Sequence, residues 1–325
     1  MKKRVIACVL AAMTALTLGA CGGSSSDSSS SGSSSSSSSA SSSSAESSSA
    51  ASSATGETTG ASSSAEETEA ASVSSGSDQA SVGSGASDGS VKDLDAIKAA
   101  GKMVVGITDF EPMDYKDDNG EWIGFDADLA KKVGEDLGVD VEFEEIDWDN
   151  KILELENGSI DCVWNGMTLT DEVTKSMSCT DPYCMNAQVV VLKSDKADEY
   201  QDADSLKDLS FAVETGSAGE EAAEDNGLDY TGVTAQSDAL LEVESGSSDA
   251  CIIDLLMASA MTGEGTSYSD LTYTVELTSE KYGVGCRKNS DLCTYLNEEF
   301  AKFYQDGTIT EIAEKYKLTD ALIGG

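Results

Sequence analysis

The chain has 325 residues, with 60 aspartate and glutamate residues against 20 lysine and arginine residues and a net charge of −40 at pH 7. Such an acidic chain is disfavoured as a partner for nucleic acid or for anionic membrane surfaces. Histidine is absent, which excludes serine–histidine and cysteine–histidine catalysis and the usual zinc sites. The missing histidine therefore disfavours an enzyme, and we expect no catalytic residue, no metal and no cofactor.

Residues 1–20 have the pattern of a secretory leader. Positive residues at positions 2 to 4 precede an apolar run over 5–18 that is too short to span a bilayer. Cys21 directly follows a small Gly-Ala pair, an order that resembles bacterial lipoprotein leaders. We expect Cys21 to be lipidated and to hold the protein on the outer face of the cytoplasmic membrane, since two acyl chains give stable anchoring. An ordinary secretory leader with an incidental cysteine is the alternative.

Residues 21–90 read as a disordered tether. After Cys21 the segment is mostly serine, with alanine, glycine, threonine and eight acidic residues, and it has no aromatic residue and no lysine or arginine. Such a composition cannot bury a core. A flexible coil of this length spans roughly 45 Å, enough to hold a domain clear of the membrane. A modified interaction segment is the competing interpretation.

From residue 91 onward, hydrophobic periodicity predicts alternating helices and strands. The elements expected first are a helix over 91–100, a strand over 103–107, a helix from about 126 to 137, a strand over 139–146, a helix over 148–157 and a strand over 161–164. Asp126 is expected to be the N-cap of the second helix, and a glycine follows each helix to end it. This β-α-β-α-β order predicts a parallel sheet.

The second half repeats this architecture. The expected elements are strands over 188–192 and 209–213, a loop over 216–218, helices over 219–225 and 238–245, a strand over 250–253, a return strand over 282–286 and two C-terminal helices. Six cysteines fall in the domain without a C-x-x-C pair, which disfavours a metal or redox motif, and their pairing stays open. They are Cys162, Cys179, Cys184, Cys251, Cys286 and Cys293.

Several short motifs follow one another along the chain. They are Gly124-Phe-Asp-Ala-Asp-Leu-Ala130, Asp147-Trp-Asp149 with Gly158-Ser-Ile-Asp161, Thr168-Leu-Thr170 before Thr180-Asp-Pro-Tyr183, Val-Glu-Thr-Gly over 213–216, and Asp306-Gly-Thr308. In order and spacing they resemble the extracellular solute-binding proteins of amino-acid ABC importers. The resemblance covers residues 91 to about 318.

The resemblance implies an α/β fold of two lobes, each a mainly parallel sheet flanked by helices, joined by two crossing strands. Lobe 1 would comprise 91–190 plus 283–325, and lobe 2 would comprise 191–282. The ligand would lie in the cleft between them. This agrees with the rule that open α/β sheets bind ligands beyond the carboxyl ends of their strands.

The resemblance also implies which lobe 1 residues hold the ligand. Phe110 would lie over it, and Trp148 would form a second wall, with plain core packing as the alternative for both rings. A third group aligns with the segment that binds the ligand's amino and carboxylate groups, namely Asn165, Gly166, Met167 and Thr168. Asp109 and Glu111 flank Phe110 and favour a basic or polar ligand, unless they are solvated loop acids.

In lobe 2, Gly216, Ser217 and Ala218 lie between a strand and a helix start, where free amides and the helix dipole can receive a carboxylate. Asp254 matches the acid that pairs with the ligand's ammonium, with a surface carboxylate as its alternative. One departure concerns Val173, which stands where most relatives carry an arginine that clamps the carboxylate. The amides alone, a lysine such as Lys175 or Lys281, or a different kind of ligand would have to compensate.

The sequence therefore predicts a lipid-anchored binding protein that captures a small polar solute, most simply an amino acid, and delivers it to a membrane permease. No phosphate-binding loop is present in the sequence, so another chain would hydrolyse ATP. The alternatives are an extracellular sensor module and a dehydratase on the same fold. In the dehydratase, acid–base work would fall to Asp109, Glu111 or Asp254.

Overall fold

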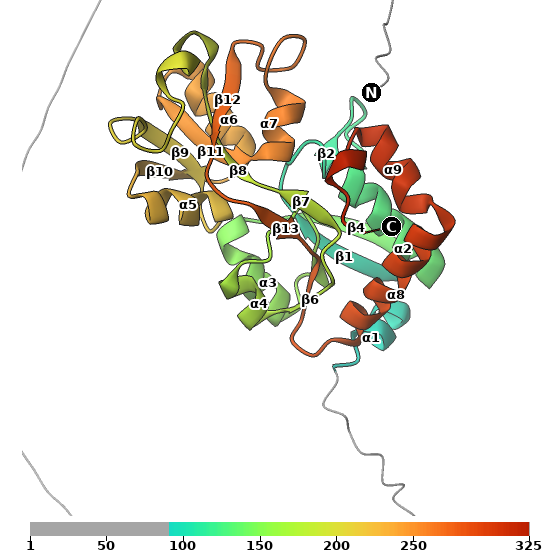
Figure 1. Cartoon of the computed structure of the whole chain (residues 1–325). Coiled ribbons are helices and arrows are strands. Elements are labelled where there is room, and N and C mark those ends of the chain that lie inside the picture. The colour runs from blue at the N-terminus through green and yellow to red at the C-terminus, as the bar shows by residue number, and fades with distance from the viewer. Residues whose placement is uncertain (1–90, 325) are drawn as a thin grey trace, which may run out of the picture. The chain divides into compact units, whose positions relative to one another are not determined.

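The computed structural model describes residues 91–324, and the predicted leader, Cys21 and the tether lie outside that range (Figure 1). The helices are α1 (Asp93–Ala100), α2 (Phe125–Leu137), α3 (Lys151–Asn157), α4 (Asp171–Ser176), α5 (Ala218–Asn226), α6 (Gln236–Ser245), α7 (Leu255–Met261), α8 (Asp291–Asp306) and α9 (Thr308–Tyr316). Within 91–324 no helix is long and apolar enough to cross a bilayer.

The first sheet has five strands in the order β4-β1-β5-β14-β6. They are β1 (Lys102–Ile107), β4 (Asp140–Glu145), β5 (Cys162–Val163), β6 (Ser178–Cys179) and β14 (Gly285–Cys286). β1 pairs in parallel with β4 and β5, as the β-α-β-α-β order predicts, whereas β14 runs antiparallel to both neighbours. Met103 and Val105 pack with α1, α2 and α8 on one face, and Val104 packs with the α3 and α4 side on the other.

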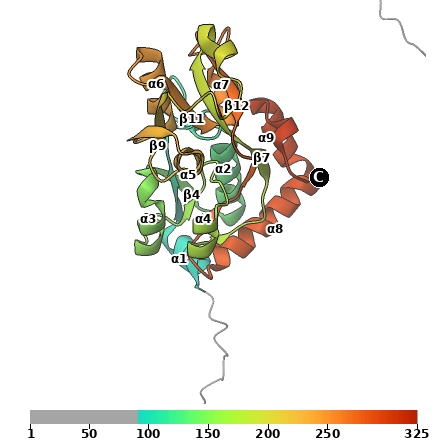
Figure 2. The same cartoon turned by 60° about the vertical axis from the view of Figure 1, so that its left-hand side comes forward.

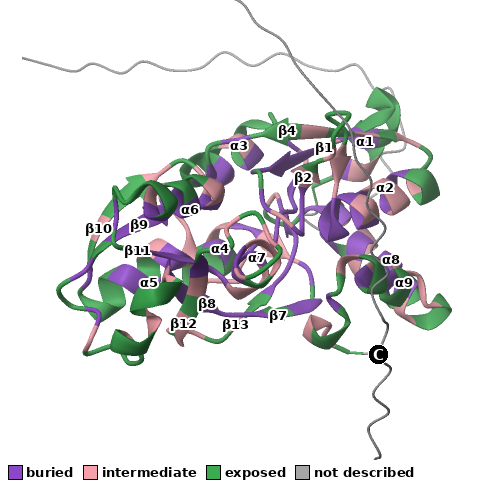
Figure 3. Ribbon diagram, turned by 90° about the horizontal axis from the view of Figure 1, so that it is seen from above, coloured by how far each residue is buried: buried purple, intermediate pink, exposed green. Residues whose placement is uncertain are grey.

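The second sheet repeats this arrangement in the order β10-β9-β11-β8-β12. Its strands are β8 (Gln188–Lys193), β9 (Ser210–Glu214), β10 (Asp229–Val233), β11 (Ala250–Asp254) and β12 (Leu271–Glu276). β9 pairs in parallel with β10 and β11, and β8 is the antiparallel strand. Apolar side chains of β8 and β11 alternate between two buried clusters, so both faces of the sheet are covered. Figure 3 colours most of both strands as buried.

Two short strands connect the sheets. β7 (Cys184–Asn186) leads from the first sheet into β8, and β13 (Glu280–Tyr282) leads from the second sheet back into β14. They pair antiparallel, with Tyr282 opposite Cys184, and lie side by side between the lobes in Figure 1. Figure 2 shows β7 from another side, with α8 and α9 beyond it. The expected two-lobe fold with two crossing strands is therefore confirmed.

The glycines expected to end the first helices do so, but the expected N-cap of α2 is wrong. Gly101 and Gly138 end α1 and α2 in the left-handed conformation. The N-cap of α2 is Gly124, whose φ of 132° and close approach to the Met113 carbonyl leave no space for a side chain. Asp126 instead lies in the first turn of α2, fully buried, and burial raises the pKa of its carboxyl to about 7.

Other expected elements differ in detail. The helix over 148–157 begins as a 3-10 turn, η1 (Trp148–Asn150), before α3. The return strand over 282–286 is divided between β13 and β14. The sequence did not predict the helices α4 and α7, the strands β6, β10 and β12, or the short strands β2 (Tyr115–Lys116) and β3 (Trp122–Ile123). The six cysteines of residues 91–324 are all free thiols.

Candidate functional site

A cavity of about 310 Å³ opens between the two lobes, which belong to one compact unit of the chain. Strands β5, β9 and β11 all point their carboxyl ends at it, where open α/β sheets bind ligands. Ten of the eleven predicted ligand residues line it. They are Phe110, Trp148, Asn165, Gly166, Met167, Thr168, Gly216, Ser217, Ala218 and Asp254. Asp109 is exposed and does not line the cavity.

The two predicted aromatic walls come from lobe 1. Phe110 follows β1 and packs edge-on against Tyr282 of β13, with 6.4 Å between ring centroids. It also presses on Gly166, where an added Cβ would lie 2.5 Å from the Phe110 ring. Trp148 belongs to η1 and is buried. Because both rings are held by packing, they offer the cavity rigid apolar area.

The polar groups at the end of β5 are largely engaged within the protein. The Asn165 side chain bonds Thr108 and Asp114, and the Gly166 amide donates to Asp126 at 2.7 Å. These two residues therefore fix the strand end. The Thr168 hydroxyl donates to Glu280 of β13 at 2.9 Å, which ties the cavity wall to a crossing strand.

Asp254 ends β11 and is only 3% exposed. Its carboxylate accepts hydrogen bonds from the Tyr282 hydroxyl at 2.5 Å and from the Gln188 amide at 3.1 Å, and from the side-chain amides of Asn186 and Gln236. Burial, followed by the nearby carboxylate of Glu280, raises the pKa of Asp254 to about 8. The site thus holds a buried acid that a cation would stabilise in its charged form.

Glu214 is a second buried acid of the cavity, and the sequence reasoning missed it. It ends β9, is 2% exposed, and its Oε1 has no hydrogen-bond partner within residues 91–324. Burial, and then the charge of Asp254, raise the pKa of Glu214 to about 8. Its place at the carboxyl end of a predicted parallel strand was the available signal, because open α/β sheets bind ligands there.

The start of α5 faces lobe 1 closely. Ser217 is the N-cap, and its hydroxyl accepts from the amides of Gly219 and Glu220. The amide of Ala218 has no protein acceptor within the described residues and remains available at the positive end of the helix. Gly216 has a φ of 74°, and a Cβ there would lie 2.8 Å from the Asp149 Cα of lobe 1.

Of the residues that the structure describes, Lys151 is the only lysine or arginine lining this cavity. It begins α3, is 4% exposed, and its Nζ donates to the carbonyls of Trp148 at 3.2 Å and Gly216 at 2.8 Å. Burial lowers the pKa of its ammonium. The sequence reasoning missed it, although it lies one turn after Trp148 and thus on the same helical face.

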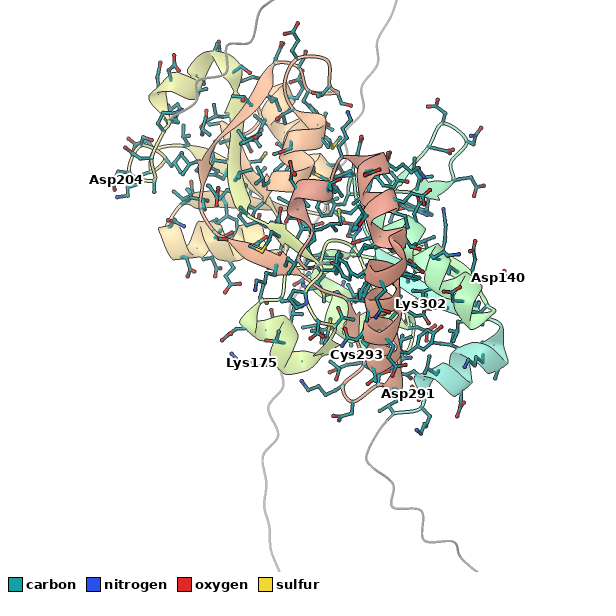
Figure 4. All side chains as sticks on the ribbon, turned by 45° about the vertical axis from the view of Figure 1, so that its right-hand side comes forward. Asp140, Lys175, Asp204, Asp291, Cys293 and Lys302 are labelled. Carbon is teal, nitrogen blue, oxygen red and sulfur yellow. The ribbon has the colours of Figure 1, made fainter. Side chains whose placement is uncertain are left out.

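The two lysines proposed to replace the missing arginine lie elsewhere. Lys175 is exposed and pairs with Asp171 at 2.9 Å, and Figure 4 shows it at the outer surface of α4. Lys281 is exposed and lines a separate pocket behind Thr168. Val173 itself is buried in the cavity wall.

Acidic residues outnumber Lys151 around the cavity. The carboxylates that line it are Glu172, Glu214, Glu220, Glu221, Glu224 and Asp254. Fields of one sign in a cleft with low-dielectric walls concentrate ligands of the opposite charge.

Comparisons with known proteins agree with this geometry. Residues 103–319 match the family of bacterial extracellular solute-binding proteins, family 3. The chain is 28% identical over 228 residues to the L-cystine-binding protein of Escherichia coli, covering 69% of this chain and 85% of that protein. It is 31% identical over 240 residues to an ABC transporter glutamine-binding protein of Bacillus subtilis, covering 70% and 85%.

A solved structure is similar in both lobes. It is an ABC uptake transporter substrate-binding protein from Streptococcus pneumoniae with bound histidine, at 28% identity and a TM-score of 0.65, covering 72% of this chain and 99% of that chain. The match of the family to most of the described residues settles the classification. The chain belongs to the bacterial extracellular solute-binding proteins of family 3.

Proposed function

We propose that this protein captures an amino acid between its two lobes and delivers it to the permease of an ABC importer. The observation that carries the proposal is the set of oxygen acceptors at one end of the cavity. Asp254 lies beside Glu214 and Gln188 in the cavity lining. Glu214 and Gln188 each have one buried side-chain oxygen that has no hydrogen-bond partner within residues 91–324. A primary ammonium has three N–H donors and matches such a set.

The ligand would span both lobes. Its ammonium would displace the proton that burial keeps on Asp254 and Glu214, and its apolar part would lie against Phe110 and Trp148. Its carboxylate would face the free amide of Ala218. Only a ligand that touches both lobes favours the closed form, so capture and closure are one event.

The charge of the lining narrows the ligand class. Six acidic side chains against one lysine disfavour glutamate and aspartate as ligands. They favour an amino acid whose side chain is neutral or positively charged.

The remaining parts of the chain fit delivery at a membrane. We propose that residues 1–20 are removed, that Cys21 carries the lipid, and that residues 22–90 tether the binding unit outside the cytoplasmic membrane. The hinge would lie at β7 and β13. The expected lobe boundary at 190 falls inside β8, all of which belongs to the second sheet, so lobe 2 would begin at about residue 187.

The dehydratase alternative is less well supported, because its acid–base residues are not brought together. Asp109 is exposed, and Glu111 lines a different pocket between α7 and α9. Only Asp254 of the three faces the main cavity. The proposed role is therefore binding without turnover.

Calorimetric titration of the purified chain with a panel of the twenty standard amino acids and L-cystine tests the proposal. We expect micromolar or tighter binding of at least one neutral or basic member, with one site per chain. Binding of no member, or of glutamate and aspartate alone, would contradict it.

A further inference from the structure

The cavity contains a buried cation, Lys151, that forms no ion pair with any of the described residues. Lys151 is 4% exposed, and none of the ion pairs within residues 91–324 involves it. A buried ammonium without an anion is unfavourable, which is why burial lowers the pKa of this side chain. The two hydrogen bonds of its Nζ go to neutral carbonyls, so one of its three donors remains.

The position of Nζ relates it to the start of α5. Its acceptor at 2.8 Å is the carbonyl of Gly216, two residues before Ala218, whose amide is free at the N-terminus of the helix. Nζ also lies 5.1 Å from the centroid of the Trp148 ring. A cation from lobe 1 and an amide from lobe 2 therefore approach one region of the cavity wall, and a carboxylate could contact both.

The surroundings of Val173 explain why binding of a carboxylate would need Lys151. Val173 lies in the first turn of α4, is 2% exposed, and packs in the same buried cluster as Trp148. Its side chain offers no donor. Glu172, adjacent in α4, lines the same cavity as Lys151 and Val173, so the ammonium and the segment where the arginine is missing border one cavity.

We propose that Lys151 is the residue that binds the ligand's carboxylate, in place of an arginine at position 173. The inference rests on the proposed function, because it requires a carboxylate-bearing ligand. The ammonium of Lys151 and the amide of Ala218 hold the carboxylate from opposite lobes. The carboxylate thereby joins the lobes beside the existing contact between Lys151 and Gly216.

A comparison of two ligands with wild-type and variant protein distinguishes carboxylate binding by Lys151 from a purely structural role. The tightest-binding amino acid of the panel is compared with the same compound carrying a carboxamide in place of its carboxylate. Wild-type protein is expected to bind the carboxamide at least about 30-fold more weakly, the lower end of the loss when one partner of a buried charge pair is removed. Lys151→Met is expected to weaken the acid by a similar factor and to distinguish acid from amide by less than about 3-fold.

Two further variants complete the design. Lys175→Met removes an exposed lysine that does not line the cavity and should keep the wild-type ratio of acid to amide affinity. Lys151→Gln keeps a donor for the Gly216 carbonyl without the charge, and should lose discrimination as Lys151→Met does. Thermal unfolding of each ligand-free variant establishes that it is folded.

The outcomes are distinct. A Lys151→Met or Lys151→Gln protein that keeps the wild-type preference for the acid would overturn the assignment of Lys151 and leave the proposed function standing. Equal weakening of acid and amide would show that Lys151 only holds the lobes together, and would also overturn the assignment. If no amino acid binds wild-type protein, both the proposed function and this inference fail.

Discussion

The close approach of the lobes at Gly216 gives a prediction whose size follows from the geometry. A Cβ at Gly216 would lie 2.8 Å from the Asp149 Cα, closer than side-chain carbon atoms come to backbone in folded proteins. In Gly216→Ala the lobes must therefore move apart in the closed form. Overpacking of this kind costs about 1–3 kcal/mol, which corresponds to about 5-fold to 150-fold weaker ligand binding.

Gly227 provides a matched control. It ends α5 with a φ of 64°, close to the 74° of Gly216, and a Cβ there would meet nothing within 4 Å. Both substitutions carry the cost of a side chain in the left-handed conformation, about 1–2 kcal/mol. Only Gly216→Ala adds the collision with lobe 1.

Thermal unfolding and calorimetry of the two variants separate the effects. Both variants should lose similar stability without ligand, but only Gly216→Ala should bind the panel amino acid more weakly. Equal affinity in the two variants would refute the reasoning, because the loop at 216 would then be free of lobe 1 in the ligand-bound state.

Three further predictions concern charge and anchoring. Asp254→Ala should weaken binding by about 2 kcal/mol or more in calorimetry, because the ligand's ammonium loses its buried partner. Without ligand, the stability of the protein should fall as the pH rises from 5 to 8. Burial raises the pKa of the Glu214 carboxyl to about 8, so the folded state holds a proton that the unfolded chain releases near pH 4.5. Even one pKa unit is about 1.4 kcal/mol, or about 3–5 °C in melting temperature, and Glu214→Gln should reduce that slope without abolishing it, because burial raises the pKa of Asp254 to about 8 as well. Cys21→Ser should release the protein from membranes on fractionation, whereas a membrane-bound variant would exclude the lipid anchor.

The elements that the sequence predicted well are those whose signals are local. Gly101 and Gly138 end helices because left-handed backbone there favours glycine whatever the tertiary surroundings. The buried strands β8 and β11 contain the uninterrupted apolar runs 189–192 and 250–253, so their composition alone identified them. By contrast, β10 has Asp229 and Gly232 within an edge strand, and neither residue favours a strand.

The residues that the sequence analysis assigned wrongly or missed owe their positions to contacts with residues far away in the chain. Asp126 has the local pattern of an N-cap, but Gly124 makes the turn and the carboxylate turns inward to Tyr183 and Gly166. Lys151 is a charged helical residue of the kind usually exposed to solvent, but its ammonium lies over Trp148 and bonds the carbonyl of Gly216 from lobe 2. No local pattern encodes that approach.

The most direct test of the central claim is a crystal structure of the protein with the tightest-binding amino acid of the panel. The account predicts one ligand in the cavity, with its ammonium within hydrogen-bonding distance of Asp254 and its body against Phe110. A ligand that touches one lobe only, or that lies outside the cavity, would contradict the claim that the two lobes grip the solute together.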